Sequence, residues 1–281
     1  MARMAYRGVN QLNRDWTLLV GDFSGAEFAP VADIVAKHGQ VVRTSTPAEA
    51  ATKLAAAALP PVVMVLAWPR PGAISQAEIA SLRKAAPLSR LLAVLGSWCE
   101  GEGRSGHVIP GVIRTVWHQW IPRWTDEFQP RRANLPAWGL PETTGDDERL
   151  LSLAASRHPR GTGMIAVVSR DLDAAELFGA ACRQRGYYTA WLLTIEDLLR
   201  VSPLAAILWD GATSRIEELA TIRRKTIAPI VALIDFPRAD DVRRATESGA
   251  AAVLGRPLIL ENLFWHLDRL AMPPPAIERV A

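Results

Sequence analysis

Cysteine and net charge are both scarce in this chain of 281 residues. Its two cysteines, Cys99 and Cys182, are too few for a disulfide framework or a closed zinc site. Its 32 basic and 29 acidic side chains leave a formal net charge of +3, too weak for a dedicated nucleic-acid-binding surface. No apolar run approaches the ~20 residues of a membrane helix, and residues 1–7 lack the apolar stretch of a secretory signal. We therefore expect a cytoplasmic protein that binds neither nucleic acid nor membrane.

The motifs of common nucleotide and hydrolase sites are missing as well. No Gly-x-Gly-x-x-Gly follows the first strand-like run of either half, and neither a P-loop nor a Gly-x-Ser-x-Gly elbow occurs. The composition, 49% hydrophobic and 22% charged, is that of a folded protein, and the length fits two domains. These patterns predict a fold but favour no enzyme class.

The second half of the chain alternates apolar runs with helix-like segments. Short β-rich runs are expected to form strands at residues 164–168, 187–193, 205–209, 229–234 and 251–254, and a helical segment follows each. Capping-box spacing at Asp173–Glu176 and at Ser214–Glu217 predicts the starts of two of these helices. Strands buried on both faces and joined by crossover helices indicate a parallel sheet covered on both sides.

The first half repeats this order. Strands are predicted at residues 17–20, 41–43, 62–67, 91–95 and 112–116, with helix starts marked by capping boxes at 46–49 and 75–78. A glycine-rich segment at 96–111 replaces the fourth helix, and the last helix is expected near 122–128. The fold class is α/β, with two flavodoxin-like (βα)5 doubly wound parallel-sheet domains in tandem. We expect them at 16–128 and 161–272, between an extension (1–15), a Pro-rich linker (129–160) and a flexible tail (273–281).

The second domain resembles a response-regulator receiver domain. Residues 247–258 (Glu-Ser-Gly-Ala-Ala-Ala-Val-Leu-Gly-Arg-Pro-Leu) match the end of a receiver, where Gly-Ala precedes the fifth strand and Lys-Pro ends it. Asp210 ends the third strand, where receivers carry their phosphoacceptor aspartate. The resemblance covers about 161–271, and over 16–126 it rests mainly on element order. It implies phosphorylation on the aspartate with Mg²⁺ bound by neighbouring carboxylates, as in a two-component phosphorelay.

The matching positions depart from the receiver pattern in all but one place. The acidic pair that ends strand one falls on Ser169 and Arg170, with Asp171 one position late; the hydroxyl position falls on Ile234, and the lysine position on Arg256. A cation at Arg170 disfavours a metal ion. We predict that Asp210 forms a direct ion pair with Arg170 or Arg256. The degenerate phosphoacceptor pocket is therefore expected to contain Asp210, Arg170, Asp171, Ser169 and Arg256.

The first domain carries still less of this pattern. Its phosphoacceptor position falls near Ala67 or Trp68, and Asp22 alone stands near the acidic pair. We therefore expect this domain to bind no Mg²⁺ and to accept no phosphoryl group.

The favoured interpretation is a non-enzymatic signalling or protein-interaction module built from pseudo-receiver domains, without a cofactor or metal. Its partner is expected to be another protein, and self-association is open. One alternative is a response regulator phosphorylated at Asp210 with Mg²⁺. Another is a small-ligand-binding α/β protein that uses the loop from Gly96 to Gly111. The polar and aromatic contacts of that loop would be Trp98, Glu100, Glu102, Arg104 and His107.

Overall fold

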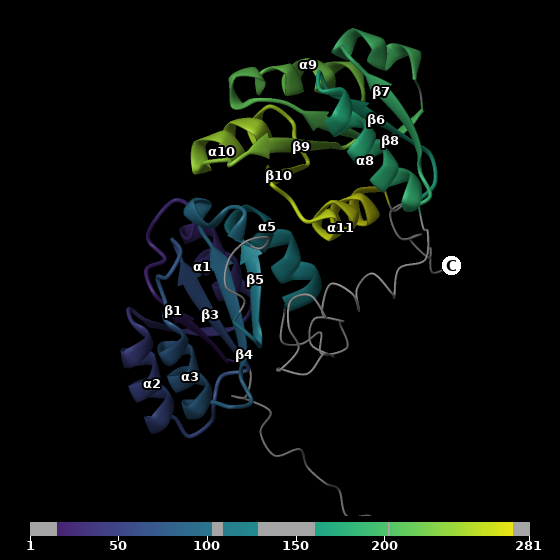
Figure 1. Ribbon diagram of the computed structural model, residues 1–281. Helices are drawn as coiled ribbons and strands as arrows, with labels where there is room; N and C mark the ends of the chain where they lie inside the picture. The colour runs from purple at the N-terminus through teal and green to yellow at the C-terminus, as the bar shows by residue number, and fades with distance from the viewer. Residues whose placement is uncertain (1–15, 103–108, 129–160, 202, 272–281) are drawn as a thin grey trace, which may run out of the picture. The chain divides into compact units, whose positions relative to one another are not determined.

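The chain folds into two compact units. The computed structural model describes residues 16–102, 109–128, 161–201 and 203–271 (Figure 1). The expected extension, linker and tail, together with Arg104 and His107, lie outside these residues. Each unit contains one five-stranded sheet whose strands all run parallel, which confirms the predicted fold class. No helix among the described residues has both the length and the apolar character to cross a membrane.

The first unit follows the predicted order closely. Thr46 and Ser75 accept hydrogen bonds from the backbone N–H groups of Glu49 and Glu78, so both predicted capping signals start helices. Its elements are β1 (Trp16–Val20), α1 (Ala29–His38), β2 (Gln40–Thr44), α2 (Pro47–Ala56), β3 (Val63–Trp68), α3 (Gln76–Ala85), β4 (Arg90–Leu95), the 3₁₀ turn η1 (Ser97–Cys99), β5 (Val112–Val116), α5 (Trp117–Arg123) and the π-helical turn η2 (Trp124–Phe128).

The last helix of this unit was placed too late in the sequence. Helix α5 begins directly after β5, and Pro122 lies inside it. Trp117, Trp120 and Trp124 recur on one helical face and are buried, and the rings of Trp120 and Trp124 stack at 5.5 Å. Burial of this aromatic face outweighs the helix-breaking tendency of the proline.

The second unit has the same order of elements. Its elements are β6 (Met164–Val168), α8 (Leu172–Gln184), β7 (Tyr188–Leu192), the 3₁₀ helix η3 (Ile195–Arg200), β8 (Leu204–Asp210), the 3₁₀ turn η4 (Thr213–Arg215), α9 (Glu218–Lys225), β9 (Ile230–Asp235), α10 (Ala239–Glu247), β10 (Ala252–Arg256) and α11 (Leu260–Ala271).

Two helix starts in the second unit differ from expectation. Asp171, not Asp173, caps α8, because its carboxylate accepts from the N–H groups of Asp173 and Ala174. The predicted cap at Ser214 falls instead in η4, and α9 starts only at Glu218. The short turn places Arg215 and Glu218 beside the end of β8, where they matter for the site.

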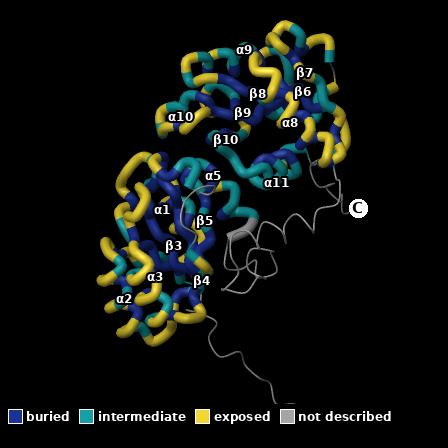
Figure 2. Tube along the Cα trace, viewed as in Figure 1, coloured by how far each residue is buried: buried dark blue, intermediate teal, exposed yellow. Residues whose placement is uncertain are grey.

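The core of the second unit lies on both faces of its sheet. Phe178 and Cys182 of α8 pack on one face together with Leu263 and Leu267 of α11. Side chains from η3, α9 and α10 cover the other face. In the first unit, α2 and α3 cover one face, around Leu54 and Leu82. Figure 2 shows the strands of both units buried and the outer faces of many helices exposed.

The strand order fixes where a site is to be sought. It is β2-β1-β3-β4-β5 in the first unit and β7-β6-β8-β9-β10 in the second. This is the doubly wound 2-1-3-4-5 order, whose direction of winding reverses between the first and third strands. Ligand and reaction sites of such sheets lie at that reversal, outside the carboxyl ends of the strands. In the second unit this is the point between β6 and β8.

Candidate functional site

Asp210 is the central side chain at the carboxyl edge of the second sheet. It ends β8, and only 5% of its side chain is exposed. Ser169, which follows β6, donates its hydroxyl to Asp210 Oδ2 at 2.6 Å. Arg256, at the end of β10, forms an ion pair with Asp210 Oδ1. Both carboxylate oxygens are therefore engaged by side chains from other strands, and the predicted pair with Arg256 is confirmed.

Arg256 also binds a second carboxylate. Its Nη2 donates to Asp235 Oδ2 at 3.0 Å, and its Nε lies 2.9 Å from Asp235 Oδ1. Asp235 ends β9, directly across from Arg256 in the register of the parallel ladder. The planar guanidinium thus joins the ends of β8, β9 and β10, which the single ammonium of a lysine is poorly shaped to do.

Of the two partners that the prediction left open for Asp210, the structure has Arg256, and Arg170 instead faces Glu218. Its guanidinium is 3.5 Å from Glu218 Oε1, and its side chain is 67% exposed. Glu218 also accepts from Trp209 Nε1 at 3.0 Å and from Arg215 at 3.3 Å. The carboxylate that Arg170 faces comes from α9, an element that the receiver pattern does not mark.

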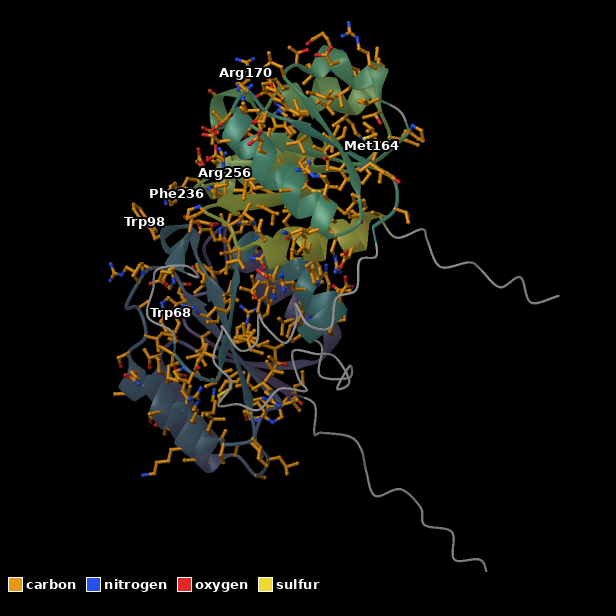
Figure 3. All side chains as sticks on the ribbon, turned by 45° about the vertical axis from the view of Figure 1, so that its right-hand side comes forward. Trp68, Trp98, Met164, Arg170, Phe236 and Arg256 are labelled. Atoms are coloured by element: carbon orange, nitrogen blue, oxygen red, sulfur yellow. The ribbon has the colours of Figure 1, made fainter. Side chains whose placement is uncertain are left out.

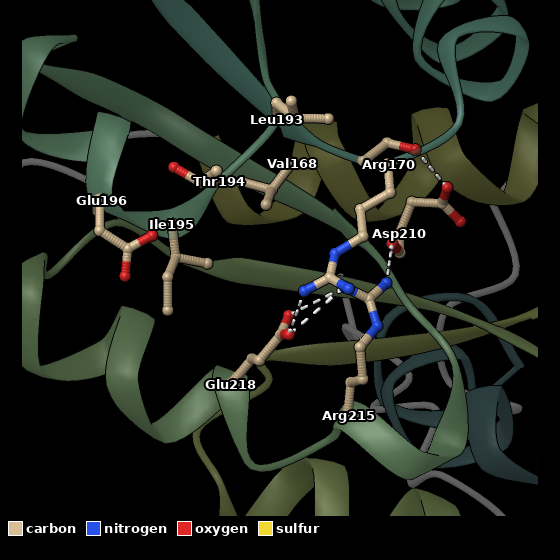
Figure 4. A pocket seen from close by; sticks show the side chains of 10 residues that line it. Val168, Arg170, Leu193, Thr194, Ile195, Glu196, Asp210, Arg215 and Glu218 are labelled. Carbon is tan, nitrogen blue, oxygen red and sulfur yellow. Dashed lines mark hydrogen bonds and ion pairs between the residues drawn. The ribbon is translucent and has the colours of Figure 1, made fainter.

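Arg170, Arg215 and Asp210 line two neighbouring hollows. One, of about 180 Å³, lies toward the loop after β7 and is shown in Figure 4, with Arg170 and Arg215 converging on Glu218. The other, of about 260 Å³, opens between Arg170, Arg215 and Arg256. In Figure 3, Arg170, Arg256 and Phe236 lie at one end of the sheet, and Met164, where β6 begins, lies at the opposite end.

Ser169 and Asp171 organise the loop that follows β6. The N–H of Asp171 donates to Ser169 Oγ at 3.0 Å, while the carboxylate of Asp171 caps α8. The hydroxyl of Ser169 has one proton, and the charged acceptor at 2.6 Å on Asp210 takes it in preference to a neutral carbonyl. Asp171 lines the larger hollow, but its carboxylate is engaged with the N–H groups at the start of α8.

The donor set at this edge does not fit a magnesium ion. Mg²⁺ takes oxygen ligands in near-octahedral geometry, usually with one or two carboxylates. Here Asp210 is held by Ser169 and Arg256, and Arg170 brings a cation to the position of the second carboxylate. Across the described parts of the chain, no three His, Cys, Asp or Glu side chains come together as a metal-binding group. Ile234, at the hydroxyl position, is fully buried.

The corresponding edge of the first unit has no counterpart of Asp210. Val20 pairs with Leu66, as Val168 pairs with Trp209, so the register places Ala67 where the second unit has Asp210. Asp22 is exposed there and accepts from the backbone and hydroxyl of Ser24 at 2.8 and 2.7 Å. These two hydrogen bonds lower the pKa of Asp22. No carboxylate stands at the end of β3.

Three of the five predicted loop contacts, Trp98, Glu100 and Glu102, lie among the described residues. Trp98 lies in η1 and is exposed, and Glu100 and Glu102 are partly buried. Arg104 and His107 fall in the segment that the structure leaves undescribed. The ligand-binding alternative for residues 96–111 therefore stays a prediction.

Three side chains of the site escaped the sequence reasoning. They are Asp235, Arg215 and Glu218. Asp235 had a signal, because a carboxylate that directly follows an apolar strand stands at the same edge as Asp210 and Arg256. Arg215 and Glu218 had none, since their positions depend on where η4 ends and α9 begins.

Comparison with known proteins gives a likeness of fold. No family model and no curated protein matches the chain. Among 66 matching solved chains, the receiver domain of the Francisella response regulator 1452 is 17% identical, with a TM-score of 0.35, over 39% of this chain and 97% of its own. A response regulator from Thermotoga maritima is 15% identical, with a TM-score of 0.36, over 40% and 98%. The signal receiver domain of a histidine kinase from Syntrophus aciditrophicus is 20% identical, with a TM-score of 0.35, over 43% and 98%.

Proposed function

We propose that the chain is a signalling or protein-interaction module built from pseudo-receiver units, and that it acts through protein contacts without Mg²⁺-dependent phosphorylation. The observation that carries this proposal is the double engagement of Asp210. Its two carboxylate oxygens are held by Ser169 and Arg256, and Arg256 is in turn held by Asp235. A cation within the protein thus performs the charge neutralisation that a bound metal ion performs in a working receiver.

Permanent pairing has a consequence for output. In a switchable site, the charge at the edge changes, and the loops that read it change with it. Here Arg256, at the end of β10, pairs with carboxylates at the ends of β8 and β9. These carboxylates are part of the protein, so the pairing does not depend on a ligand that binds and dissociates. The unit therefore presents one arrangement of its edge to a partner protein.

A labelling experiment with reversion tests this proposal. The full chain is incubated with acetyl phosphate and Mg²⁺, and acid-labile adducts are measured by intact mass. We expect no adduct on the wild type or on Asp210→Asn. A triple variant, Ser169→Asp, Arg170→Asp and Arg256→Lys, restores the acidic pair and the lysine, and we expect it to acquire a Mg²⁺-dependent adduct on Asp210.

Two controls complete the design. Asp210→Asn in the triple-variant background removes the acceptor and should remove the adduct. Ser24→Asp with Arg43→Lys in the first unit introduces an aspartate and an arginine-to-lysine exchange where no acceptor aspartate ends β3, and should give none. Mg²⁺-dependent labelling of the wild type that disappears in Asp210→Asn would overturn the proposal.

The rival function is a response regulator phosphorylated at Asp210 with Mg²⁺. It draws support from one observation, which is that Asp210 lines an open hollow of about 260 Å³ at the reversal point of the sheet. An incoming phosphoryl group would have to displace Arg256 from Oδ1. The same labelling experiment decides between the two functions.

A further inference from the structure

Strand β7 is an edge strand without a charged residue. The sheet of the second unit ends at β7, so one side of this strand has no neighbour among the described residues. Residues 187–193 read Tyr-Tyr-Thr-Ala-Trp-Leu-Leu and contain no Asp, Glu, Lys or Arg. Exposed sheet edges usually carry charges or prolines that prevent another strand from pairing with them. The other edge strands of the two described sheets each contain an arginine, namely Arg43, Arg114 and Arg256.

The backbone of β7 is free to pair on its outer side. Tyr188 N–H donates to Gly163 at 3.0 Å, and Leu192 accepts from Ser169 at 3.1 Å, so alternate residues from 188 to 192 turn toward β6. In a parallel ladder the residues between them turn the opposite way. Thr189 and Trp191 therefore present N–H and C=O groups outward, and these groups are unpaired within the described residues.

Tyr188 and Trp191 at this edge are residue types found at the centres of interfaces, and Arg183 of α8 donates to Thr189 Oγ1 beside them at 2.8 Å. Tyr188 is 74% exposed, Trp191 48% and Leu193 56%. Tyrosine and tryptophan are enriched among the residues that contribute most to protein–protein binding. The sequence around them is also of high strand propensity, so an extended partner backbone meets no conformational conflict.

The first unit provides an internal comparison. Its strand β2 has the same burial pattern as β7 and pairs with β1 in the corresponding register. Position by position, Gln40 corresponds to Tyr188 and Arg43 to Trp191. The outer side of β2 thus carries the charge that protects an edge, and the outer side of β7 carries an aromatic ring at the same place.

We propose that β7 is a self-association surface, on which a second copy of this chain adds its own β7 in antiparallel orientation. Pairing centred on Ala190 places Thr189 of one copy opposite Trp191 of the other, so that the outward N–H and C=O groups of both exchange hydrogen bonds. Because the run is uncharged, pairing it with itself buries no like charges. A two-fold arrangement pairs the β7 edge of one copy with the β7 edge of the other and leaves neither β7 edge free. The result is a dimer with one continuous ten-stranded sheet and not an open fibre.

The test measures the oligomeric state of the full chain. Sedimentation equilibrium at concentrations up to about 0.1 mM is expected to give a dimer for the wild type. Tyr188→Lys changes an exposed side chain and should shift the equilibrium to monomer by at least tenfold in Kd. Thr189→Pro removes an outward N–H while leaving the bonds to β6 in place, and should do the same.

The duplication supplies the matched control. Val41→Pro makes the same change at the corresponding outward position of β2, and the dimer should persist. Amide exchange gives a second measurement that needs no variant, because the N–H groups of Thr189 and Trp191 should become more protected as the concentration of wild type rises. A wild type that stays monomeric over this range, or a dimer that both β7 variants leave unchanged, overturns the proposal. These measurements do not involve Asp210, so they are independent of the labelling experiment.

Discussion

The two units share one scaffold and differ at its carboxyl edge. The ladder registers match Asp210 with Ala67, Asp235 with Gly96, Arg256 with Trp117 and Ser169 with Gly21. In the second unit these positions hold two carboxylates, a guanidinium and a hydroxyl that contact one another. In the first unit they hold two glycines, an alanine and a buried tryptophan.

This difference indicates that the charges of the edge are kept or lost as a set. A buried carboxylate without a cation, or a cation without a carboxylate, costs several kcal/mol, roughly 3–5 when one partner of a buried pair is removed. A complete set is tolerated, and so is a fully apolar replacement. The second unit has the complete charged set, and the first unit has uncharged residues at all four matching positions. The fold itself does not require either set of residues, because the same strand order occurs with the charged set and with the uncharged one.

Arg256→Met gives the largest expected effect, because it breaks the set in the second unit. Asp210, with 5% of its side chain exposed, would keep only the hydroxyl of Ser169 as a partner. We expect a loss of about 3–5 kcal/mol in the free energy of unfolding of this unit. Denaturant-dependent amide exchange of β8 measures it.

Two controls make this prediction specific. Asp210→Asn in the Arg256→Met background removes the unpaired charge and should recover much of the loss. Arg43→Met makes the same substitution at an exposed arginine of β2 and should cost within about 0.5 kcal/mol. If Arg256→Met and Arg43→Met cost the same, the ion pair contributes nothing to the second unit.

Ser169→Ala should have the next largest effect. It removes the 2.6 Å hydrogen bond to the buried carboxylate of Asp210, and hydrogen bonds to charged groups are worth about 1.5–3 kcal/mol. The first unit offers the exposed counterpart, in which Ser24 donates to Asp22 at 2.7 Å. Ser24→Ala should change the free energy of unfolding by less than about 0.5 kcal/mol, because water replaces the lost donor. Equal effects in thermal unfolding of the two variants would contradict the argument from burial.

The sequence predicted the sheets better than the helices that flank the site. Strands such as Met164–Val168 and Val112–Val116 were placed correctly, because buried parallel strands are continuous apolar runs with clear ends. The start of α9 was missed, since Ser214–Glu217 has the spacing of a capping box and the chain instead forms a 3₁₀ turn there. Local capping preferences compete with packing, and packing of Ile216 and Leu219 prevailed.

The candidate site was predicted only as far as it lies on strands. Asp210, Ser169 and Arg256 follow or end strands, so the topology brings them together, and the pair between Asp210 and Arg256 followed from it. The partner of Arg170 did not follow, because Glu218 enters from α9 at a position set by the length of η4. A long charged side chain can reach several neighbours of opposite charge, and sequence spacing does not predict which of them it pairs with.

Gly21→Ser tests whether the first unit can regain the hydroxyl of the second. Gly21 has φ 110°, a conformation that costs a residue with a side chain roughly 1–2 kcal/mol. A Cβ there would also stand 3.0 Å from Cβ of Ala67. We expect a loss of about 2 kcal/mol in the free energy of unfolding of the first unit. Gly25→Ser is the control, since nothing lies within 4 Å of a Cβ at that position. If Gly21→Ser left the free energy of unfolding unchanged, the loop would adjust easily to a side chain. Gly21 would then not account for the missing hydroxyl in the first unit.

The last comparison concerns high pH and distinguishes the helices that follow the first strands. Cys182 of α8 stands four residues before Gly186, as Val35 of α1 stands four before Gly39, and both side chains are buried. Burial raises the pKa of the Cys182 thiol from 9.0 to about 12. Burial, together with the nearby Asp268, also raises the pKa of Tyr187 in the same unit.

The sign of the pH dependence follows from these shifts. Above pH 9 the unfolded chain releases the Cys182 proton while the folded unit retains it, so the free energy of unfolding falls by up to about 1.4 kcal/mol per pH unit. The contribution is fully present below pH 9 and is lost as the pH approaches 12. Denaturant unfolding between pH 8 and pH 10.5, followed by amide exchange in each unit, should show this decline in the second unit. Cys182→Ala should flatten it, and Tyr187→Phe should leave it intact up to the range where a tyrosine of ordinary pKa, about 10, begins to ionise. A decline of equal slope in Cys182→Ala would assign the alkaline loss to other groups.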